Sequence, residues 1–242
     1  MFNNKTQRSV KIISELMPQN FGNFNELTRT IVQSKFSGAD FVKLQLYSSE
    51  KIWNNNSRKY LEVSKTELKE IYNFCKNLDI ELTASVFDEE KLDWCESLDF
   101  KTYKIASRVV RDDKKLCEKI ISTSKNIYAS LGFHDIATGA PFKNKNVRYL
   151  YCVSNYPTNL YDINMPNFDS SFMDGFSDHT IGIDACLFAI SRGATVIEKH
   201  FSNNKSLGIK TDPGHAGSMN SKDLEKLRSS ADSITLLRSS IK

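Results

Sequence analysis

Short apolar runs alternate with longer amphipathic segments along most of the chain. The run Val10–Ser14 predicts a first strand, and the spacing of Leu27, Ile31 and Val32 predicts a helix over residues 25–36. The same alternation predicts further strands at 41–45, 81–85, 102–106, 127–131, 147–152 and 194–198, a strand that ends near 178, and helices at 65–78, 88–98, 112–124, 183–192 and from 221 onward.

Strands that alternate with helices in this way are typical of parallel α/β proteins, and the count of eight strand candidates favours a (β/α)8 TIM barrel. The stretch 132–146 contains Gly132, Gly139 and Pro141 and is too interrupted for a full helix. We therefore expect the fifth crossover helix to be short or missing. Because no linker or repeat is visible, we expect a single domain over residues 1–242.

Composition excludes several classes of protein. The net charge is +4, and the Lys and Arg residues are interspersed with Asp and Glu, which favours small anionic ligands over nucleic acid. No apolar run approaches the roughly 18 residues of a membrane span, so we expect no membrane partner. The five cysteines are odd in number, scattered and without ligand spacing, which indicates reduced, packed thiols in a cytoplasmic protein.

Polar residues recur where the predicted strands end. Lys43 and Gln45 alternate along one strand and so face the same way, as do Glu198 and His200. If the barrel closes, such residues meet at one mouth: Glu15, Lys43, Gln45, Ser85, Lys104, Ser107, Ser130, Ser154, Asp178, His179, Glu198, Lys199 and His200. Lysines, several hydroxyls, carboxylates and two imidazoles suit a phosphorylated carboxylate substrate and a divalent cation.

Seven motifs in this order resemble the sialic acid synthase family, also called N-acetylneuraminate synthases: Ile12–Glu15, Gly38–Gln45, Phe87–Glu90, Tyr103–Ser107, Cys152–Thr158, Phe176–Gly182 and Gly193–Phe201. The resemblance implies a transferase of sialic acid and surface carbohydrate biosynthesis, with a TIM-barrel catalytic domain. Such enzymes condense phosphoenolpyruvate with an N-acylated amino-sugar aldehyde, such as N-acetylmannosamine, and use Mn²⁺ or Mg²⁺. The products are a nonulosonic acid and phosphate.

The resemblance also implies roles for individual residues. His179 and His200 match the metal ligands of the family. The positions that match substrate-binding groups are Lys43, Ser85, Lys104, Ser107, Ser130, Ser154, Tyr156 and Ser177. The positions that match catalytic polar groups are Glu15, Gln45, Glu198 and Asp212.

The chain departs from the family pattern at several positions. Asn20 stands where the family usually has histidine, Arg108 follows the Tyr103–Ser107 motif where glycine is common, and Asp212 is separated from His215 by Pro213 and Gly214. The C-terminal antifreeze-like domain of the family has no counterpart, so we expect the catalytic barrel only. We expect a homo-oligomer, because a partner subunit would cover the surface that the short fifth crossover exposes.

Three hypotheses remain open. The first is a synthase that makes sialic acid or a relative such as legionaminic or pseudaminic acid. The second is another barrel enzyme of carbon–carbon chemistry, such as an aldolase, and the third is a non-catalytic barrel subunit. Lysines and histidines at strand ends favour the first two, because a scaffold has no need of buried cations.

Overall fold

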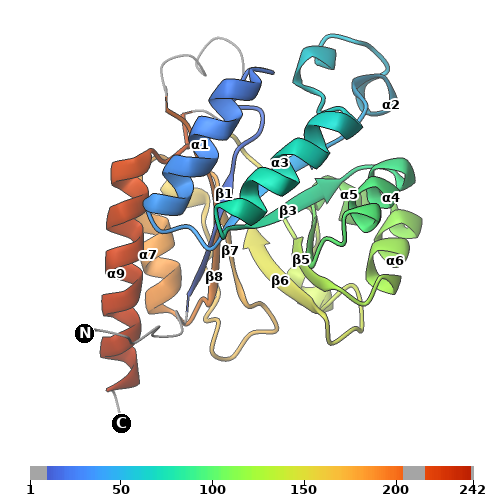
Figure 1. The fold of residues 1–242 in the computed structure, drawn as a ribbon. Helices are drawn as coiled ribbons and strands as arrows, with labels where there is room; N and C mark the ends of the chain where they lie inside the picture. The colour runs from blue at the N-terminus through green and yellow to red at the C-terminus, as the bar shows by residue number, and fades with distance from the viewer. Residues whose placement is uncertain (1–9, 204–215, 241–242) are drawn as a thin grey trace.

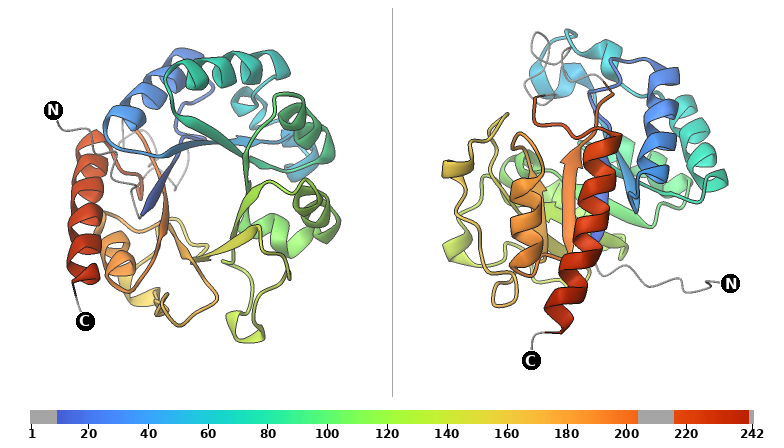
Figure 2. Two further views of the ribbon diagram at one scale, coloured as in Figure 1. Left: turned by 60° about the horizontal axis from the view of Figure 1, so that its bottom comes forward. Right: turned by 90° about the vertical axis from the view of Figure 1, so that its left-hand side faces the viewer.

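Eight parallel strands close into a barrel in the computed structural model, which describes residues 10–203 and 216–240. Each strand pairs with the next along the chain, and β8 returns to pair with β1. Figures 1 and 2 show the helices around the outside of this sheet. The expected (β/α)8 TIM barrel is confirmed.

The strands and helices have the following bounds. The strands are β1 Lys11–Glu15, β2 Phe41–Leu46, β3 Glu81–Val86, β4 Thr102–Ile105, β5 Asn126–Ser130, β6 Val147–Cys152, β7 Gly175–Asp178 and β8 Val196–His200. The helices are α1 Phe24–Phe36, α2 Ser49–Trp53, α3 Lys65–Asn77, α4 Glu89–Ser97, α5 Ser107–Asp112, α6 Lys114–Ser122, α7 Asp184–Ser191 and α9 Ser221–Ser239, with 3-10 turns η1 Lys59–Leu61, η2 Ile136–Thr138 and η3 Leu160–Asp162.

Side-chain caps fix where most of the long helices begin. Asn23 accepts a hydrogen bond from the backbone N–H of Glu26 at the start of α1, and Asp88 accepts one from the backbone N–H of Lys91 at the start of α4. Ser64 and Glu67 form a reciprocal capping box at α3. These contacts fix the first residues of α1, α3 and α4.

Some elements differ from the sequence expectation. The helix expected at 112–124 is α6, which begins after Asp113 leaves helical geometry and caps it through the N–H of Leu116; the helix α5 that precedes it was not expected. The expected fifth-crossover defect is confirmed, since only η2 lies between β5 and β6. The sixth crossover also lacks an α-helix and contains only η3, in a segment that holds Pro157 and Pro166.

The barrel interior is built in layers. The lower layer is an apolar cluster of Ile13, Phe41, Tyr128, Leu150 and Val196. Gly175 completes it on β7, because a Cβ at this position would lie 2.1 Å from the carbonyl oxygen of Val196. Two positions further along each strand, the same inward face carries Glu15, Lys43, Ser130, Cys152, Ser177 and Glu198. The two-residue period of the strands therefore places a layer of polar side chains directly above the apolar layer.

The remaining large hydrophobic cluster fills the space between the sheet and the helices. All five cysteines are free and buried, as expected of packed thiols. None of the helices in the described ranges combines the length and the apolar character that crossing a membrane requires.

Helix α9 is joined to the first two strands by one buried side chain. Arg228 donates to the carbonyl oxygens of Gly38 at 2.9 Å and Val10 at 3.0 Å, and it forms an ion pair with Asp40. Asp40 in turn accepts from the backbone N–H of Ile12. This contact connects the last helix to the place where the barrel closes.

We expect Arg228→Met to lower the free energy of unfolding by about 3 kcal/mol, because it leaves the mostly buried Asp40 carboxylate without its closest cation. Arg238→Met on the same helix is the matched control. Arg238 pairs with Asp169, which is 58% exposed, so its loss is expected to cost less than about 1 kcal/mol. Urea unfolding measures both, and equal losses would contradict the role given to Arg228.

Candidate active site

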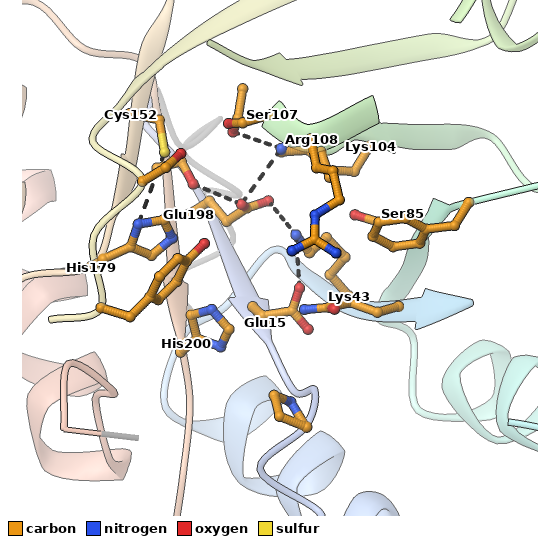
Figure 3. A pocket seen from close by; sticks show the side chains of 18 of the residues that line it. Glu15, Lys43, Ser85, Lys104, Ser107, Arg108, Cys152, His179, Glu198 and His200 are labelled. Atoms are coloured by element: carbon orange, nitrogen blue, oxygen red, sulfur yellow. Dashed lines mark hydrogen bonds and ion pairs between the residues drawn. The ribbon is translucent and has the colours of Figure 1, made fainter. Parts of the chain in front are cut away.

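A cavity of about 400 Å³ opens at the carboxyl ends of the strands. Figure 3 shows side chains from several strands converging on it. The predicted site residues that line it are Glu15, Lys43, Gln45, Ser85, Lys104, Ser107, Ser130, Ser154, Tyr156, Ser177, His179, Glu198 and His200. Asp212, also predicted for the site, lies outside the described residues.

Four buried charged residues form the base of the cavity, and we call them the buried charge network: Glu15, Lys43, Lys104 and Glu198. The ammonium of Lys43 lies 2.7 Å from Glu15 Oε2 and 3.0 Å from Glu198 Oε2. Lys104 Nζ lies 3.7 Å from Glu198 Oε1. Each charge therefore has an opposite charge beside it, which is what its burial requires.

The two carboxyl groups of the network differ in acidity. Burial raises the pKa of Glu15 above its usual value, although Lys43 opposes the change. Burial acts in the same direction on Glu198, but Lys104 and Lys43 together lower the pKa of that carboxyl to about 2. Glu198 is thus a permanent anion, whereas Glu15 is the carboxyl better able to exchange a proton.

The two lysines differ in the same way. Burial favours a lower pKa for Lys43, but the adjacent Glu15 and Glu198 raise it. For Lys104 burial prevails over the attraction of Glu198 and lowers the pKa to about 8. The ammonium of Lys104 is consequently the charge in the network that is lost first as the pH rises.

Hydroxyl groups surround this network. Ser130 accepts a hydrogen bond from Lys104 Nζ at 2.6 Å, and Ser177 donates to Glu198 Oε1 at 2.9 Å. Ser107 accepts from the backbone N–H of Gly132 at 3.0 Å, so part of its capacity is used structurally. Ser85 Oγ is buried and has no hydrogen-bond partner within the described ranges. A buried hydroxyl without a partner at the wall of a cavity is suited to a ligand.

The imidazoles of His179 and His200 lie side by side on β7 and β8, with ring centroids 5.8 Å apart. Nδ1 of His179 is 2.8 Å from the carbonyl oxygen of Val153, and Nδ1 of His200 is 3.1 Å from Gln19 Oε1. Because both oxygens can only accept, each Nδ1 carries a proton, and Nε2 is the atom that the neutral form of each ring would offer to a metal. This is the arrangement by which proteins orient metal-ligating histidines.

The surroundings of the imidazoles fit the same use. Burial, together with the nearby His179 and Lys43, lowers the pKa of His200 well below its usual value, which favours the neutral ring that binds metals. The ring of Tyr156 lies over His179, with centroids 4.0 Å apart, and is 44% exposed. Within the described ranges, no three His, Cys, Asp or Glu residues group as metal ligands.

Asp178 and Lys199 do not belong to the cavity, contrary to the expectation that they meet the other polar residues at its mouth. They are fully buried on the opposite face of β7 and β8, where Lys199 Nζ lies 2.6 Å from Asp178 Oδ2. Lys199 also donates to the carbonyl oxygen of Thr180, and the thiol of Cys186 donates to Asp178. Alternation along the strand explains the difference, because the neighbours of inward residues must face outward. The pair joins the two strands that carry the histidines.

Sequence reasoning missed part of the cavity wall. The additional lining residues are Pro18, Trp53, Arg58, Phe87, Ala106, Phe133 and Cys152, together with Arg108, whose effect on the pocket the sequence left open. Phe87 follows the end of β3, where it lines the cavity and also packs against the hydrophobic core. Trp53 and Arg58 lie in a segment rich in asparagine. The isolated tryptophan is the one feature of that segment that could have indicated a binding surface.

The family model described as the NeuB family matches residues 30–242. Pseudaminic acid synthase of Helicobacter pylori is 33% identical, over 81% of this chain and 67% of that protein. N,N'-diacetyllegionaminic acid synthase of Campylobacter jejuni is 30% identical, over 89% of this chain and 73% of that protein. N-acetylneuraminate-9-phosphate synthase of mouse is 26% identical, over 81% of this chain and 62% of that protein. The chain thus spans about two thirds of the length of these relatives.

Among solved structures, the N-acetylneuraminic acid (sialic acid) synthetase of Leptospira borgpetersenii is similar to this chain with a TM-score of 0.87. It is 26% identical, and the match covers 96% of this chain and 86% of that chain. The similarity extends over the whole barrel, including the strand ends that build the cavity.

The Asp178–Lys199 pair gives a test of how the histidine strands are held. Lys199→Met is expected to lower the free energy of unfolding by about 3–5 kcal/mol, because Asp178 would stay buried without a counter-charge. Asp178→Asn combined with Lys199→Met removes both charges and is expected to recover part of that loss. Urea unfolding of the two single variants and the double variant measures the coupling. Additive losses would show that the pair does not act as a unit.

Proposed function

We propose a reaction for this chain on the basis that it belongs to the NeuB family. The chain condenses phosphoenolpyruvate with an N-acylated amino-sugar aldehyde to give a nonulosonic acid and phosphate. The chain is a sialic acid synthase-like enzyme of that family. The proposal depends on one observation. Two imidazoles oriented to bind a metal lie beside the buried charge network.

Phosphoenolpyruvate carries a phosphate and a carboxylate, and the base of the cavity offers donors for both. Lys104 and Lys43 supply ammonium groups, and the Ser85 hydroxyl, which has no partner among the described residues, lies beside Lys104 in the strand register. Ser107, Ser130, Ser154, Ser177 and Tyr156 supply further hydroxyls around the same space. Such contacts would hold C3 of the enol against the aldehyde carbon.

The two carboxyl groups can divide the remaining work. Carbon–carbon bond formation leaves positive charge at C2, and the permanently ionised Glu198 would stabilise it. Water then adds to C2 and loses a proton, for which Glu15 is the better acceptor. The tetrahedral product loses phosphate by cleavage of the C2–O bond, and the former aldehyde oxygen takes up a proton. Gln45 lies near Glu15 on the cavity wall and would orient the acceptor or the water.

His179 and His200 would hold the divalent cation that the family resemblance implies. Imidazole donors favour Mn²⁺ over Mg²⁺, which prefers oxygen. When bound, this ion would supply Lewis acidity to the aldehyde oxygen. The protein's part is to keep both rings in the correct tautomer through Val153 and Gln19. Asp212 is proposed as a further catalytic carboxylate by resemblance alone.

The organisation of the protein is part of the same proposal. We infer one sialic-acid-synthase-like domain over residues 1–242, acting in the cytoplasm, where the five free thiols remain reduced. We infer a homo-oligomer, because the crossovers after β5 and β6 cover the sheet without α-helices. The acceptor is assigned only as an N-acylated amino sugar of the sialic, legionaminic or pseudaminic type.

Phosphate release from phosphoenolpyruvate tests the reaction. With Mn²⁺ present, we expect release that depends on an added amino-sugar aldehyde, with an equal amount of keto acid formed. Glu15→Gln is expected to reduce turnover by at least about 100-fold, because the variant loses its proton acceptor. Glu90→Gln, an exposed carboxylate on α4, is the matched control and should retain full turnover.

The outcomes separate the three hypotheses from the sequence. Condensation without phosphoenolpyruvate would indicate aldolase chemistry. Metal binding without any turnover, over a panel of N-acylated hexosamines, would indicate a non-catalytic barrel. Full turnover by Glu15→Gln would remove Glu15 as the base while leaving the reaction in place.

The lowered pKa of Lys104 predicts a pH limit on substrate capture. The ammonium form is present below its pKa of about 8 and is lost as the pH rises through that value. We expect kcat/KM for phosphoenolpyruvate to fall above pH 8, approaching about tenfold per pH unit. Lys104→Arg keeps the charge at high pH and should move this decline to higher pH. A profile for the unaltered protein that is flat beyond pH 9 would contradict the role of Lys104.

A further inference from the structure

The two imidazoles stand just past the point where β7 and β8 stop pairing with each other. The register of these strands ends at the partners Asp178 and Lys199. His179 and His200 are the next residues along the chain, and each is attached to a different neighbour. The carbonyl oxygen of His179 accepts from the N–H of Thr158 at 3.0 Å, whereas His200 pairs with β1. The ladder between β7 and β8 therefore does not by itself set the spacing of the two rings.

A group of buried polar contacts continues the connection, and we call it the lysine clamp: Asp178, Thr180 and Lys199. Lys199 Nζ lies 2.6 Å from Asp178 Oδ2 and donates to the carbonyl oxygen of Thr180 at 2.7 Å. Asp178 Oδ1 accepts from the backbone N–H of Thr180 at 2.8 Å, and Oδ2 accepts from its hydroxyl at 3.2 Å. Asp178 and Thr180 flank His179, and Lys199 precedes His200. The ammonium group thus joins the backbone beside one imidazole to the turn that carries the other.

The whole clamp is buried. The side chains of Asp178 and Lys199 are 0% exposed, and Thr180 is 0% exposed as well. The thiol of Cys186 on α7 also donates to Asp178 Oδ2, at 3.1 Å. Hydrogen bonds are directional and strengthen one another where water is excluded, so a shift of either strand end would weaken several of them together.

Stability alone gives no reason for an ion pair at this position. Taking two charges out of water is costly, and apolar residues of similar volume often stabilise a fold equally well. What a buried pair adds is a single arrangement of the elements that it joins. In the lysine clamp, these elements are the two backbone segments that carry the imidazoles.

A shared ion makes the spacing of the two rings important, because a binding constellation must be held to within about 0.5 Å. Figure 3 shows both rings on the same side of the cavity. The contacts of their Nδ1 atoms with Val153 and Gln19 set the direction of each ring. These two partners come from the segments after β6 and β1, so they do not connect one ring to the other. The lysine clamp makes that connection from the face of the strands that is turned away from the cavity.

We propose that Asp178, Thr180 and Lys199 are positioning residues that set the spacing of the two imidazoles, and thereby the affinity of the site for a divalent ion. This inference rests on the proposed function, which supplies the ion. It goes beyond that function because none of the three residues lines the cavity, so they act only through the histidines.

Calorimetric titration with MnCl2, without phosphoenolpyruvate or sugar, tests the clamp. We expect Lys199→Met to weaken Mn²⁺ binding about 10- to 100-fold, the range for groups that orient metal ligands. Asp178→Asn combined with Lys199→Met removes both charges, and it decides the question if the single variant does not fold. The double variant is expected to recover part of the stability. It should still bind Mn²⁺ as weakly as the single variant, because the two backbone segments remain unconnected.

Arg228→Met is the matched control for loss of stability. It also removes the cation of a buried ion pair, but its contacts with Val10 and Asp40 lie just before β1 and β2, at the end of the barrel opposite the cavity. Its affinity for Mn²⁺ should equal that of the unaltered protein. Circular dichroism at the titration temperature checks that each variant is folded.

Nuclear magnetic resonance of the histidine rings gives a readout that needs no ion. In proton–nitrogen correlation spectra without metal, the Nδ1–H signals of His179 and His200 should shift or broaden in the double variant. His134 is the internal reference, because its Nε2 lies 2.8 Å from the carbonyl oxygen of Gly139 and away from the clamp. A role confined to stability would leave all three rings unchanged in the folded variant.

Three results would overturn the inference. One is Mn²⁺ binding by the double variant with the affinity of the unaltered protein. Another is an equal loss of affinity in Arg228→Met, which would assign the effect to a general loosening of the barrel. The third is an absence of Mn²⁺ binding by the unaltered protein.

Failure of the proposed condensation gives a different result, because the titration contains neither substrate. A protein that binds Mn²⁺ and loses that affinity with the clamp, yet releases no phosphate from phosphoenolpyruvate, would contradict the proposed reaction and support the clamp.

Discussion

Lys43 lies between the carboxylates of Glu15 and Glu198 where the strands end, and the remainder of the cavity depends on this contact. Buried charges are stable only when paired, so the strands that carry them must keep a fixed register. The apolar layer below provides that register, because Ile13, Phe41 and Val196 occupy the same inward faces two positions earlier. Pairing also separates the acidities of the two glutamates, which gives one site both a permanent anion and a proton acceptor.

Much of this arrangement could be predicted from the sequence, because a strand imposes a period of two. A lysine inside an apolar run, such as Lys43 or Lys104, has few stable positions other than the mouth of the barrel. Alternation then places Gln45 beside Lys43 and His200 beside Glu198. The same alternation turns Asp178 and Lys199 away from the cavity, where they form a buried pair.

Other features do not follow a period and were missed. Trp53 and Arg58 reach the cavity through a short helix and a loop, and their contact with Arg108 joins segments about 50 residues apart. No local pattern encodes such a contact. The sixth crossover was predicted more easily, because Pro157 and Pro166 indicate a loop, and the segment contains no α-helix. The features that the sequence pattern did not predict therefore lie mostly in loops that connect regular elements.

The Arg228 contact has a consequence for biosynthesis. It joins the last helix to residues that lie 188 to 218 positions earlier, at the strand where β8 must also pair. While the chain emerges from the ribosome, β1 has only β2 as a neighbour until about 200 residues have been translated. Its open edge and apolar faces are exposed during that interval, when chaperones bind nascent chains. The two sides of the cavity therefore come together only after β8 has been synthesised, when Glu15 pairs with His200.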